Sequence, residues 1–167
     1  MMQSEPAAFS ERDVPATTPT GSRRDVAVSD GRAVILYDGV CGLCNRYVQF
    51  VLDRDRSGQF RFAPLQGPFA ARALARHGLP PRDVPDSMVL LDAPGTASER
   101  ARVRSDAVLS IVSRLGGAWR LAVLLRVVPW FIRDALYAMV ARVRYRLFGR
   151  LDHCALPPAD ARDRFLE

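Results

Sequence analysis

The chain has 167 residues, and all 24 of its basic side chains are arginines, because the sequence contains no lysine. Against 18 acidic residues the net charge is +6, but residues 114–150 alone hold eight arginines and one acid, Asp134. This uneven distribution is a poor fit to a uniformly basic nucleic-acid binder, and we expect no nucleic-acid partner. The lack of lysine excludes Schiff-base chemistry and a Walker-type phosphate site.

Residues 1–31 are rich in Pro, Ser, Thr, Ala and charge without any structural period, which predicts a disordered leader. The first 30 residues hold no apolar stretch of signal-peptide length. Residues 121–132, the longest apolar neighbourhood, are interrupted by Arg126 and Pro129 and fall short of the roughly 20 residues of a membrane span. Three cysteines are too few for a secreted disulfide framework. We therefore expect a cytoplasmic protein.

The first predicted strand is the apolar run of residues 33–38, which ends in the turn pair Asp38-Gly39. Apolar residues then recur at three- and four-residue steps through residues 42–55, the pattern of one helix face. Residues 60–65 form a second strand. Two strands joined by such a helix pair in parallel through a right-handed crossover.

A second helix is expected to begin at Gly67-Pro68 and to end at Gly78. Beyond a proline-rich link, residues 87–92 and 99–104 are predicted to form an antiparallel hairpin with one face exposed to water.

A third helix should follow the hairpin, with Ser105 or Asp106 as its N-cap and Gly116-Gly117 as its end. Pro129 opens a long final helix. Its apolar residues recur at helical spacing: Ile132, Leu136, Val140, Val143 and Leu147.

This order of elements predicts an α/β fold, a thioredoxin-like βαβ-ββα core with a C-terminal helical extension. We divide the chain into a disordered leader (1–31), a thioredoxin-like redox domain (32–116) and a helical extension packed on the same domain (117–167). In the simplest interpretation, the final helix packs on the core and its arginines face solvent. Alternatively, the aromatic residues among those arginines indicate docking to an anionic membrane surface or to a protein.

Cys41 and Cys44 lie between the first predicted strand and the first predicted helix. The free amides and the dipole at the start of a helix favour a thiolate, so we expect Cys41 to be the nucleophile. Cys44 lies one turn away, near enough to resolve a mixed disulfide. Asp38 either accepts backbone hydrogen bonds in its turn or takes the proton of Cys44, and the two roles can coexist.

Other interpretations of the cysteines stay open. They could be inert buried thiols, or zinc ligands together with His153 and Cys154. A c-type haem site fails because Asn45, not His, follows Cys44. Cys154 is either a small buried residue or a resolving or regulatory thiol. We predict no metal and no cofactor.

Several segments resemble the DCC-type thiol-disulfide oxidoreductases, a thioredoxin-like family named for its Asp and two Cys. They are residues 36–45 (LYDGVCGLCN), 104–107 (RSDA), 133–137 (RDALY), 144–150 (RYRLFGR) and 154–157 (CALP). The resemblance covers about residues 33–166 and implies protein-disulfide oxidoreductase activity with Cys41 and Cys44 as the redox pair.

Thioredoxins place a cis-proline before the third strand to hold the substrate backbone. In this chain Pro85 lies two residues before Ser87, so its isomer is an open question. Our candidate substrate-binding residues are Gly39, Gly42, Leu43, Pro85 and Ser87. Gly42 would leave the entry to the thiols uncrowded.

We therefore predict dithiol-disulfide exchange with a protein or small-molecule substrate, in which Cys41 attacks and Cys44 resolves. The alternative is a non-catalytic module that docks a membrane or a protein through residues 114–150.

Overall fold

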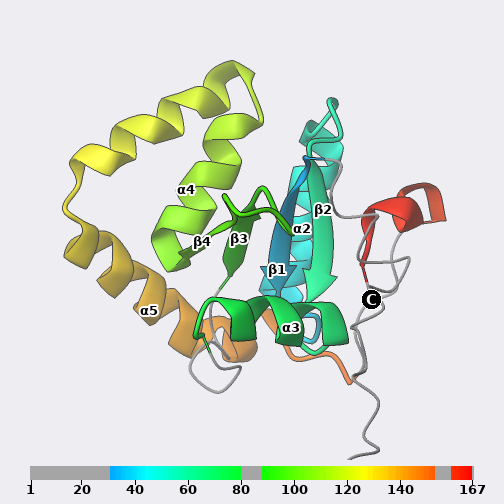
Figure 1. Cartoon of the computed structure of the whole chain (residues 1–167). Helices are drawn as coiled ribbons and strands as arrows, with labels where there is room; N and C mark the ends of the chain where they lie inside the picture. The colour runs from blue at the N-terminus through cyan, green and yellow to red at the C-terminus, as the bar shows by residue number, and fades with distance from the viewer. Residues whose placement is uncertain (1–30, 80–87, 153–158, 167) are drawn as a thin grey trace, which may run out of the picture.

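The computed structural model describes residues 31–79, 88–152 and 159–166. Its centre is a four-stranded sheet in the order β2-β1-β3-β4, with helices on both faces (Figure 1). The strands are β1 (Ala33–Tyr37), β2 (Phe60–Pro64), β3 (Val89–Asp92) and β4 (Arg100–Val103). The helices are α2 (Gly42–Arg54), α3 (Pro68–Arg76), α4 (Arg104–Arg114), η1 (Gly117–Val127), α5 (Trp130–Phe148) and η2 (Ala159–Arg164).

Strand pairing confirms the predicted topology. β1 and β2 are parallel, with Ala33 opposite Phe60, and α2 makes the crossover between them. β3 pairs antiparallel with β1, and β4 pairs antiparallel with β3. A parallel βαβ unit joined to a hairpin and a helix is the thioredoxin-like core that the sequence predicts.

The sheet is buried on both faces because side chains along a strand alternate between them. Val34, Leu36 and Leu91 pack with the apolar side of α3. Ile35 and Leu90, on the other face, pack with α2 and α4. The helix that carries both cysteines is therefore seated on the same face of the sheet as α4.

The predicted limits of α3 are confirmed. Gly67 is its N-cap and Pro68 occupies its first turn. Gly78 follows the C-terminal residue with φ +62°, and the amide of Leu79 returns to the carbonyl of Leu74 at 2.9 Å. Such a left-handed residue is the common glycine ending of a helix.

The predicted N-cap of α4 is wrong. The helix begins at Arg104 after an extended Val103, and no side chain caps its first amides. Both predicted caps have other partners: Ser105 hydrogen bonds with Asp134, while Asp106 accepts from Arg102 at 3.0 Å. The chain enters the helix through a positive φ of 52° at Arg104.

The segment formed by η1 and α5 lies beyond α4, on the far side of the sheet from β2 (Figure 1). The final helix α5 lies against α2 and α4, but much of its apolar side is exposed. Leu136 is 55% exposed and Leu147 is 69% exposed, whereas the one buried residue of α5 is Arg144. No residue of η1 is buried either. The segment touches the core, but its apolar side chains do not enter it.

The C-terminal residues lie against the opposite edge of the sheet. Phe165 forms a parallel bridge with Phe62 of β2, and the amide of Leu166 donates to the carbonyl of Phe62 at 2.8 Å. The ring of Phe165 stacks on that of Phe62.

Candidate active site

Cys41 is the N-cap of α2. Its extended backbone follows the turn after β1, and its Sγ accepts a hydrogen bond from the amide of Cys44 at 3.4 Å. A sulfur in this position faces the free amides at the positive end of the helix dipole. Both cysteines are free thiols; Cys41 is buried and Cys44 is partly buried.

Cys44 is held in its thiol form. Burial raises its pKa to about 12, and its hydrogen bond and charge interaction with Cys41 act in the same direction. The guanidinium of Arg144 opposes this shift without overcoming it. At neutral pH the pair therefore has one sulfur that keeps its proton, so Cys44 must lose that proton before it can attack a disulfide.

Asp38 is buried just before the cysteine loop, and its carboxylate accepts four hydrogen bonds. Oδ1 accepts from the amide of Val40 at 3.2 Å and from Nε2 of Gln66 at 2.9 Å. Oδ2 accepts from Nη2 of Arg144 at 3.0 Å and from the hydroxyl of Tyr145. The turn role that we expected for Asp38 is confirmed by the bond from Val40. The role of proton acceptor for Cys44 stays a prediction, and it would require Asp38 to give up one of these donors.

Arg144 and Tyr145 are the site residues that we missed. We counted Arg144 among the eight arginines of residues 114–150, but its side chain is buried and forms an ion pair with Asp38. The available signal was its spacing, since it continues the apolar line of Leu136 and Val140 at four-residue steps. Burial and the hydrogen bond to Asp38 raise the pKa of Tyr145, so its hydroxyl keeps the proton that it donates.

Residues 148–151, which we call the strap, cover the cysteine loop. The carbonyl of Gly149 accepts a hydrogen bond from the amide of Gly42 at 3.3 Å, and the amide of Leu151 donates to the carbonyl of Val40 at 2.8 Å. Through these backbone bonds Arg150 forms an isolated antiparallel β-bridge with Cys41. A Cβ on Gly42 would lie 2.1 Å from the carbonyl oxygen of Phe148. The lack of a side chain at Gly42 therefore lets the strap lie against the cysteine loop. The strap occupies the space that we expected Gly42 to leave open for substrate.

Two of the other predicted substrate-binding residues, Gly39 and Leu43, are described by the structure. Gly39 is held by Gln66 and Asn45, through its amide at 3.2 Å and its carbonyl at 2.8 Å. Leu43 lines an apolar pocket together with Cys44. Pro85 and Ser87 lie outside the described residues, as do His153 and Cys154. The isomer of Pro85 and the zinc interpretation of the cysteines are therefore not tested by the structure.

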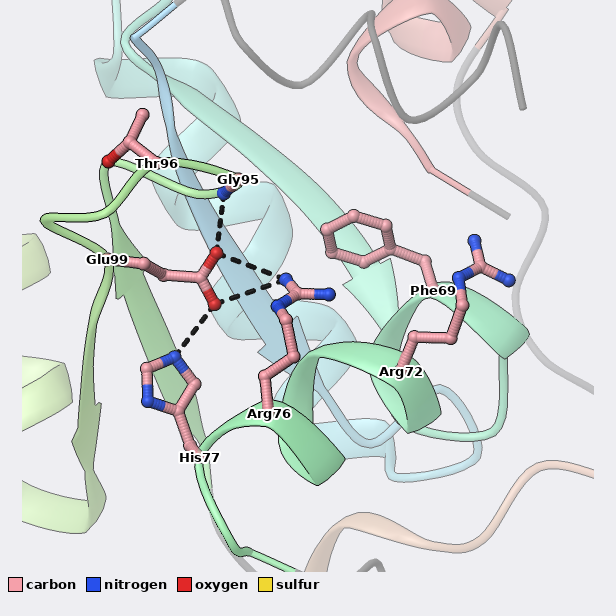
Figure 2. A pocket seen from close by; sticks show the side chains of 7 residues that line it. All are labelled: Phe69, Arg72, Arg76, His77, Gly95, Thr96 and Glu99. Atoms are coloured by element: carbon pink, nitrogen blue, oxygen red, sulfur yellow. Dashed lines mark hydrogen bonds and ion pairs between the residues drawn. The ribbon is translucent and has the colours of Figure 1, made fainter. Parts of the chain in front are cut away.

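A second pocket lies on the other side of the sheet, between α3 and the turn of the β3-β4 hairpin (Figure 2). At its centre the carboxylate of Glu99 accepts from Arg76 at 3.1 Å and from the amide of Gly95, and it lies 2.7 Å from Nε2 of His77. Burial opposes ionisation of Glu99, but these contacts outweigh it and lower its pKa. Among the residues that the structure describes, no cysteine lines this pocket, and the Glu99 cluster fastens the hairpin turn to α3.

Within residues 31–79, 88–152 and 159–166, no helix is long and apolar enough to cross a membrane. The fold and the dithiol at the start of α2 define the class, a thioredoxin-like protein with a cysteine pair between β1 and α2.

Comparison with known proteins identifies the family. A family model described as DCC1-like thiol-disulfide oxidoreductase matches residues 35–150. The uncharacterized protein YuxK of Bacillus subtilis is 38% identical over 133 residues, which cover 80% of this chain and 93% of that protein. The DCC family protein At1g52590, chloroplastic, of Arabidopsis thaliana is 41% identical over 128 residues, 76% of this chain and 71% of that protein. No solved structure matches. The chain belongs to the DCC1-like thiol-disulfide oxidoreductase family.

Proposed function

We propose that the protein exchanges thiols and disulfides through the Cys41-Gly42-Leu43-Cys44 motif. The observation that carries the proposal is the N-cap position of Cys41, whose sulfur accepts the amide hydrogen of Cys44. The thiolate of Cys41 attacks one sulfur of a substrate disulfide and forms a mixed disulfide. Cys44 then loses its proton and attacks Cys41, which releases the reduced substrate and leaves the Cys41-Cys44 disulfide.

Attack by Cys41 requires the strap to move. Cys41 is fully buried, and the bonds of Gly149 and Leu151 hold residues 148–151 against the loop. Both bonds join backbone groups at the protein surface, and each contributes only about 1 kcal/mol net. The strap can therefore open without unfolding the sheet.

Trapping of a mixed disulfide tests this function. Cys44→Ser leaves Cys41 joined to its substrate, which non-reducing mass spectrometry detects as an adduct at Cys41. We expect Cys41→Ser to lower the reduction of hydroxyethyl disulfide by about 1,000-fold, since it removes the nucleophile. The matched control Cys154→Ser keeps the redox pair and should remain within about twofold of the unmodified chain. Full activity in Cys41→Ser would refute the proposal.

We propose a second, non-catalytic function, docking of residues 114–150 to an anionic membrane surface. All fifteen large apolar side chains that are exposed in the described part of the chain fall between Trp119 and Leu151. Contiguous exposed apolar surface of this kind is typical of an interface. Trp130 is 70% exposed and Phe131 is 57% exposed, so aromatic residues are available to the headgroup region.

The charge on this surface favours anionic lipid. Arg114 and Arg126 are ion-paired with Asp92 and Asp106 of the core, so they do not contribute free charge. Arg120, Arg142 and Arg146 are exposed and have no carboxylate partner within the described ranges. Basic side chains beside apolar ones are complementary to a negatively charged membrane.

Vesicle co-sedimentation tests the docking surface. The triple change of Arg120, Arg142 and Arg146 to Gln should weaken binding to phosphatidylglycerol vesicles on the order of 100-fold, at about 1 kcal/mol per arginine. The matched control changes Arg56, Arg100 and Arg162 to Gln and should bind normally. Binding should also fall with salt and survive Cys41→Ser with Cys44→Ser, because docking does not need the thiols. No vesicle binding at low salt would end this proposal.

We keep the cytoplasm as the proposed compartment, because two free thiols close together fit a reducing environment. The Arabidopsis relative is named as a chloroplastic protein.

A further inference from the structure

The strap pairs with the cysteine loop as one strand pairs with another. Arg150 lies opposite Cys41 in an isolated antiparallel bridge, and Cys41 has the extended backbone of a strand residue. The strap leaves α5 through Gly149, which has a φ of 76°, and then lies against the loop. The loop before α2 is therefore a short strand whose partner is the strap.

Both hydrogen bonds of this bridge come from the residues on either side of the facing pair. The amide of Gly42 donates to the carbonyl of Gly149 at 3.3 Å, and the amide of Leu151 donates to the carbonyl of Val40 at 2.8 Å. The facing residues are thus a non-hydrogen-bonded pair, the kind in which opposite Cα atoms are closest, about 4.5 Å apart. A disulfide joins residues whose Cα atoms are about 4.4 to 6.8 Å apart. A cysteine at the facing position of the strap would therefore lie within disulfide reach of the attacking sulfur.

The strap supplies the partners of two backbone groups of the cysteine loop. Gly42 is the first residue of α2, and the amides of a first helical turn have no partner inside their helix. The carbonyl of Val40 lies on the other side of Cys41. Cys41 uses its own backbone groups locally, since its amide donates to Asp38 at 3.2 Å and its carbonyl accepts from Asn45 at 3.0 Å. When the strap opens, the loop therefore presents one donor and one acceptor, on either side of the nucleophile.

We infer that the strap holds the place of the substrate, and that the substrate is a polypeptide disulfide in an extended conformation. The substrate cysteine takes the position of Arg150. The carbonyl before it accepts from Gly42, and the amide after it donates to Val40. The inference rests on the proposed function, because it names the substrate class of the same dithiol.

Two observations support an extended chain as the substrate. Addition of an extended peptide to a strand edge is a common binding mode, in which backbone hydrogen bonds provide the affinity. The structure already contains such a chain, the strap, in the required register. In addition, a Cβ on Gly42 would lie 3.3 Å from the carbonyl oxygen of Gly149 that accepts its hydrogen bond. The lack of a side chain at Gly42 therefore serves backbone pairing at this position.

The exchange balances with the groups that the site holds, because both cysteines start as thiols. Cys41 gives its proton to solvent, and its thiolate attacks the substrate sulfur that faces it. The substrate S–S bond breaks, and the other substrate sulfur leaves as a thiolate and takes up a proton. Cys44 then gives up its proton and attacks Cys41, and the first substrate sulfur leaves and takes up a proton. Two electrons and two protons have passed to the substrate, and a Cys41-Cys44 disulfide has formed.

The facing position is tested in the strap itself. In a chain with Cys44→Ser and Cys154→Ser, Arg150→Cys should form a disulfide with Cys41 on mild oxidation, which mass spectrometry detects as a cross-linked peptide pair. Leu151→Cys is the matched control and should leave both thiols free, because successive side chains of a strand point to opposite sides. Absence of the cross-link in Arg150→Cys, or equal cross-linking in both variants, would overturn the pairing.

Proline substitutions in a peptide substrate test what replaces the strap. The reference substrate is the symmetrical disulfide of the peptide Ser-Ala-Cys-Ala-Ser, blocked at both ends. Proline after the cysteine removes the amide that donates to Val40, while the cysteine stays extended, the conformation that residues before proline favour. We expect kcat/KM to fall about fivefold, which corresponds to the loss of one hydrogen bond.

Proline before the cysteine is the matched control for this peptide. Its carbonyl can still accept from Gly42, so kcat/KM should stay within about twofold of the reference. Equal rates for the two proline peptides would overturn the inference.

Amide exchange locates the peptide on the loop. In Cys44→Ser, the mixed disulfide of Cys41 with the reference peptide is compared with its mixed disulfide with mercaptoethanol. We expect the peptide to displace the strap, so that the amide of Leu151 exchanges faster while the amide of Gly42 stays protected. With mercaptoethanol, which has no backbone, the two amides should change together. Loss of protection at Gly42 in the peptide adduct, or continued protection at Leu151, would overturn the inference.

Hydroxyethyl disulfide separates this inference from the proposed function, because it has no backbone to pair with the loop. If neither this disulfide nor the peptides are reduced, the proposed function has failed and the inference falls with it. If hydroxyethyl disulfide is reduced and the two proline peptides react at equal rates, the function holds and the substrate assignment has failed.

Discussion

The sheet and the η1-α5 segment use similar amounts of apolar sequence in opposite ways. β1 is buried at every position, and α3 and α2 cover its two faces. In η1, by contrast, no side chain is buried, and in α5 the buried residue is an arginine. Apolar periodicity therefore predicts α5 as it predicts α2, but it does not predict what each helix packs against. The core buries its own apolar surface, whereas the segment leaves its apolar surface exposed.

The contact between the two regions should be the most sensitive point. Arg144→Ala leaves the buried carboxylate of Asp38 without its cation, and loss of one partner of a buried pair costs about 3 to 5 kcal/mol. Chemical denaturation should show this loss in the free energy of unfolding.

Arg142→Ala, an exposed arginine two residues earlier on the same helix, is the matched control and should be nearly neutral. A stability loss below about 1 kcal/mol in Arg144→Ala would show that the ion pair does not join the two regions.

Two leucine-to-alanine substitutions, one in the core and one in η1, compare how much the side chains of the two regions contribute to the free energy of unfolding. Leu74→Ala, at a fully buried position in α3, should cost about 2 to 5 kcal/mol in the free energy of unfolding. Leu124 in η1 is 62% exposed, so Leu124→Ala should stay within about 0.5 kcal/mol. Equal losses in urea titrations would mean that η1 is packed in solution.

Gly42→Ala should act on the strap alone. The added methyl group meets backbone, which cannot turn aside as a side chain does, so residues 148–151 must leave the loop. We expect a loss of about 1 to 2 kcal/mol from the two broken backbone bonds, and faster amide exchange at Leu151. Gly78→Ala is not a suitable control because Gly78 has a positive φ; Ala71→Gly, at an exposed position of α3, tests the general cost of glycine instead. An unchanged exchange rate at Leu151 would show that the strap tolerates a methyl group.

The smallest expected effect is on the loss of stability in acid, through Glu99 at the hairpin turn. The pKa of Glu99 is lowered from its usual value of 4.5, so its contribution to stability is present above pH 4.5 and is lost as pH falls through its folded-state pKa. Glu99→Gln should therefore flatten the decline of stability below pH 4.5, with an effect at pH 7 below about 1 kcal/mol. A decline of the same steepness in both proteins would exclude Glu99 as its source.

The sequence predicted the core well because its signals are local. The run after Arg32, the helical spacing after Gly42 and the glycine at position 78 each fix an element without reference to distant residues. The cap of α4 could not be predicted, because Asp134 competes for Ser105 across 29 positions. The same limit applies to the candidate site, where Arg144 reaches Asp38 from 106 positions away.

The bridge between Phe62 and Phe165 has a consequence for self-association. An uncovered edge strand is a template on which another chain can add its own strand. The amide of Leu166 already uses the carbonyl of Phe62, so β2 presents less of its edge to a second molecule. The opposite edge, β4, carries Arg100 and Arg102, and charge on an edge strand repels a like-charged copy. The sheet is thus protected at one edge by residues 165 and 166 and at the other by arginine.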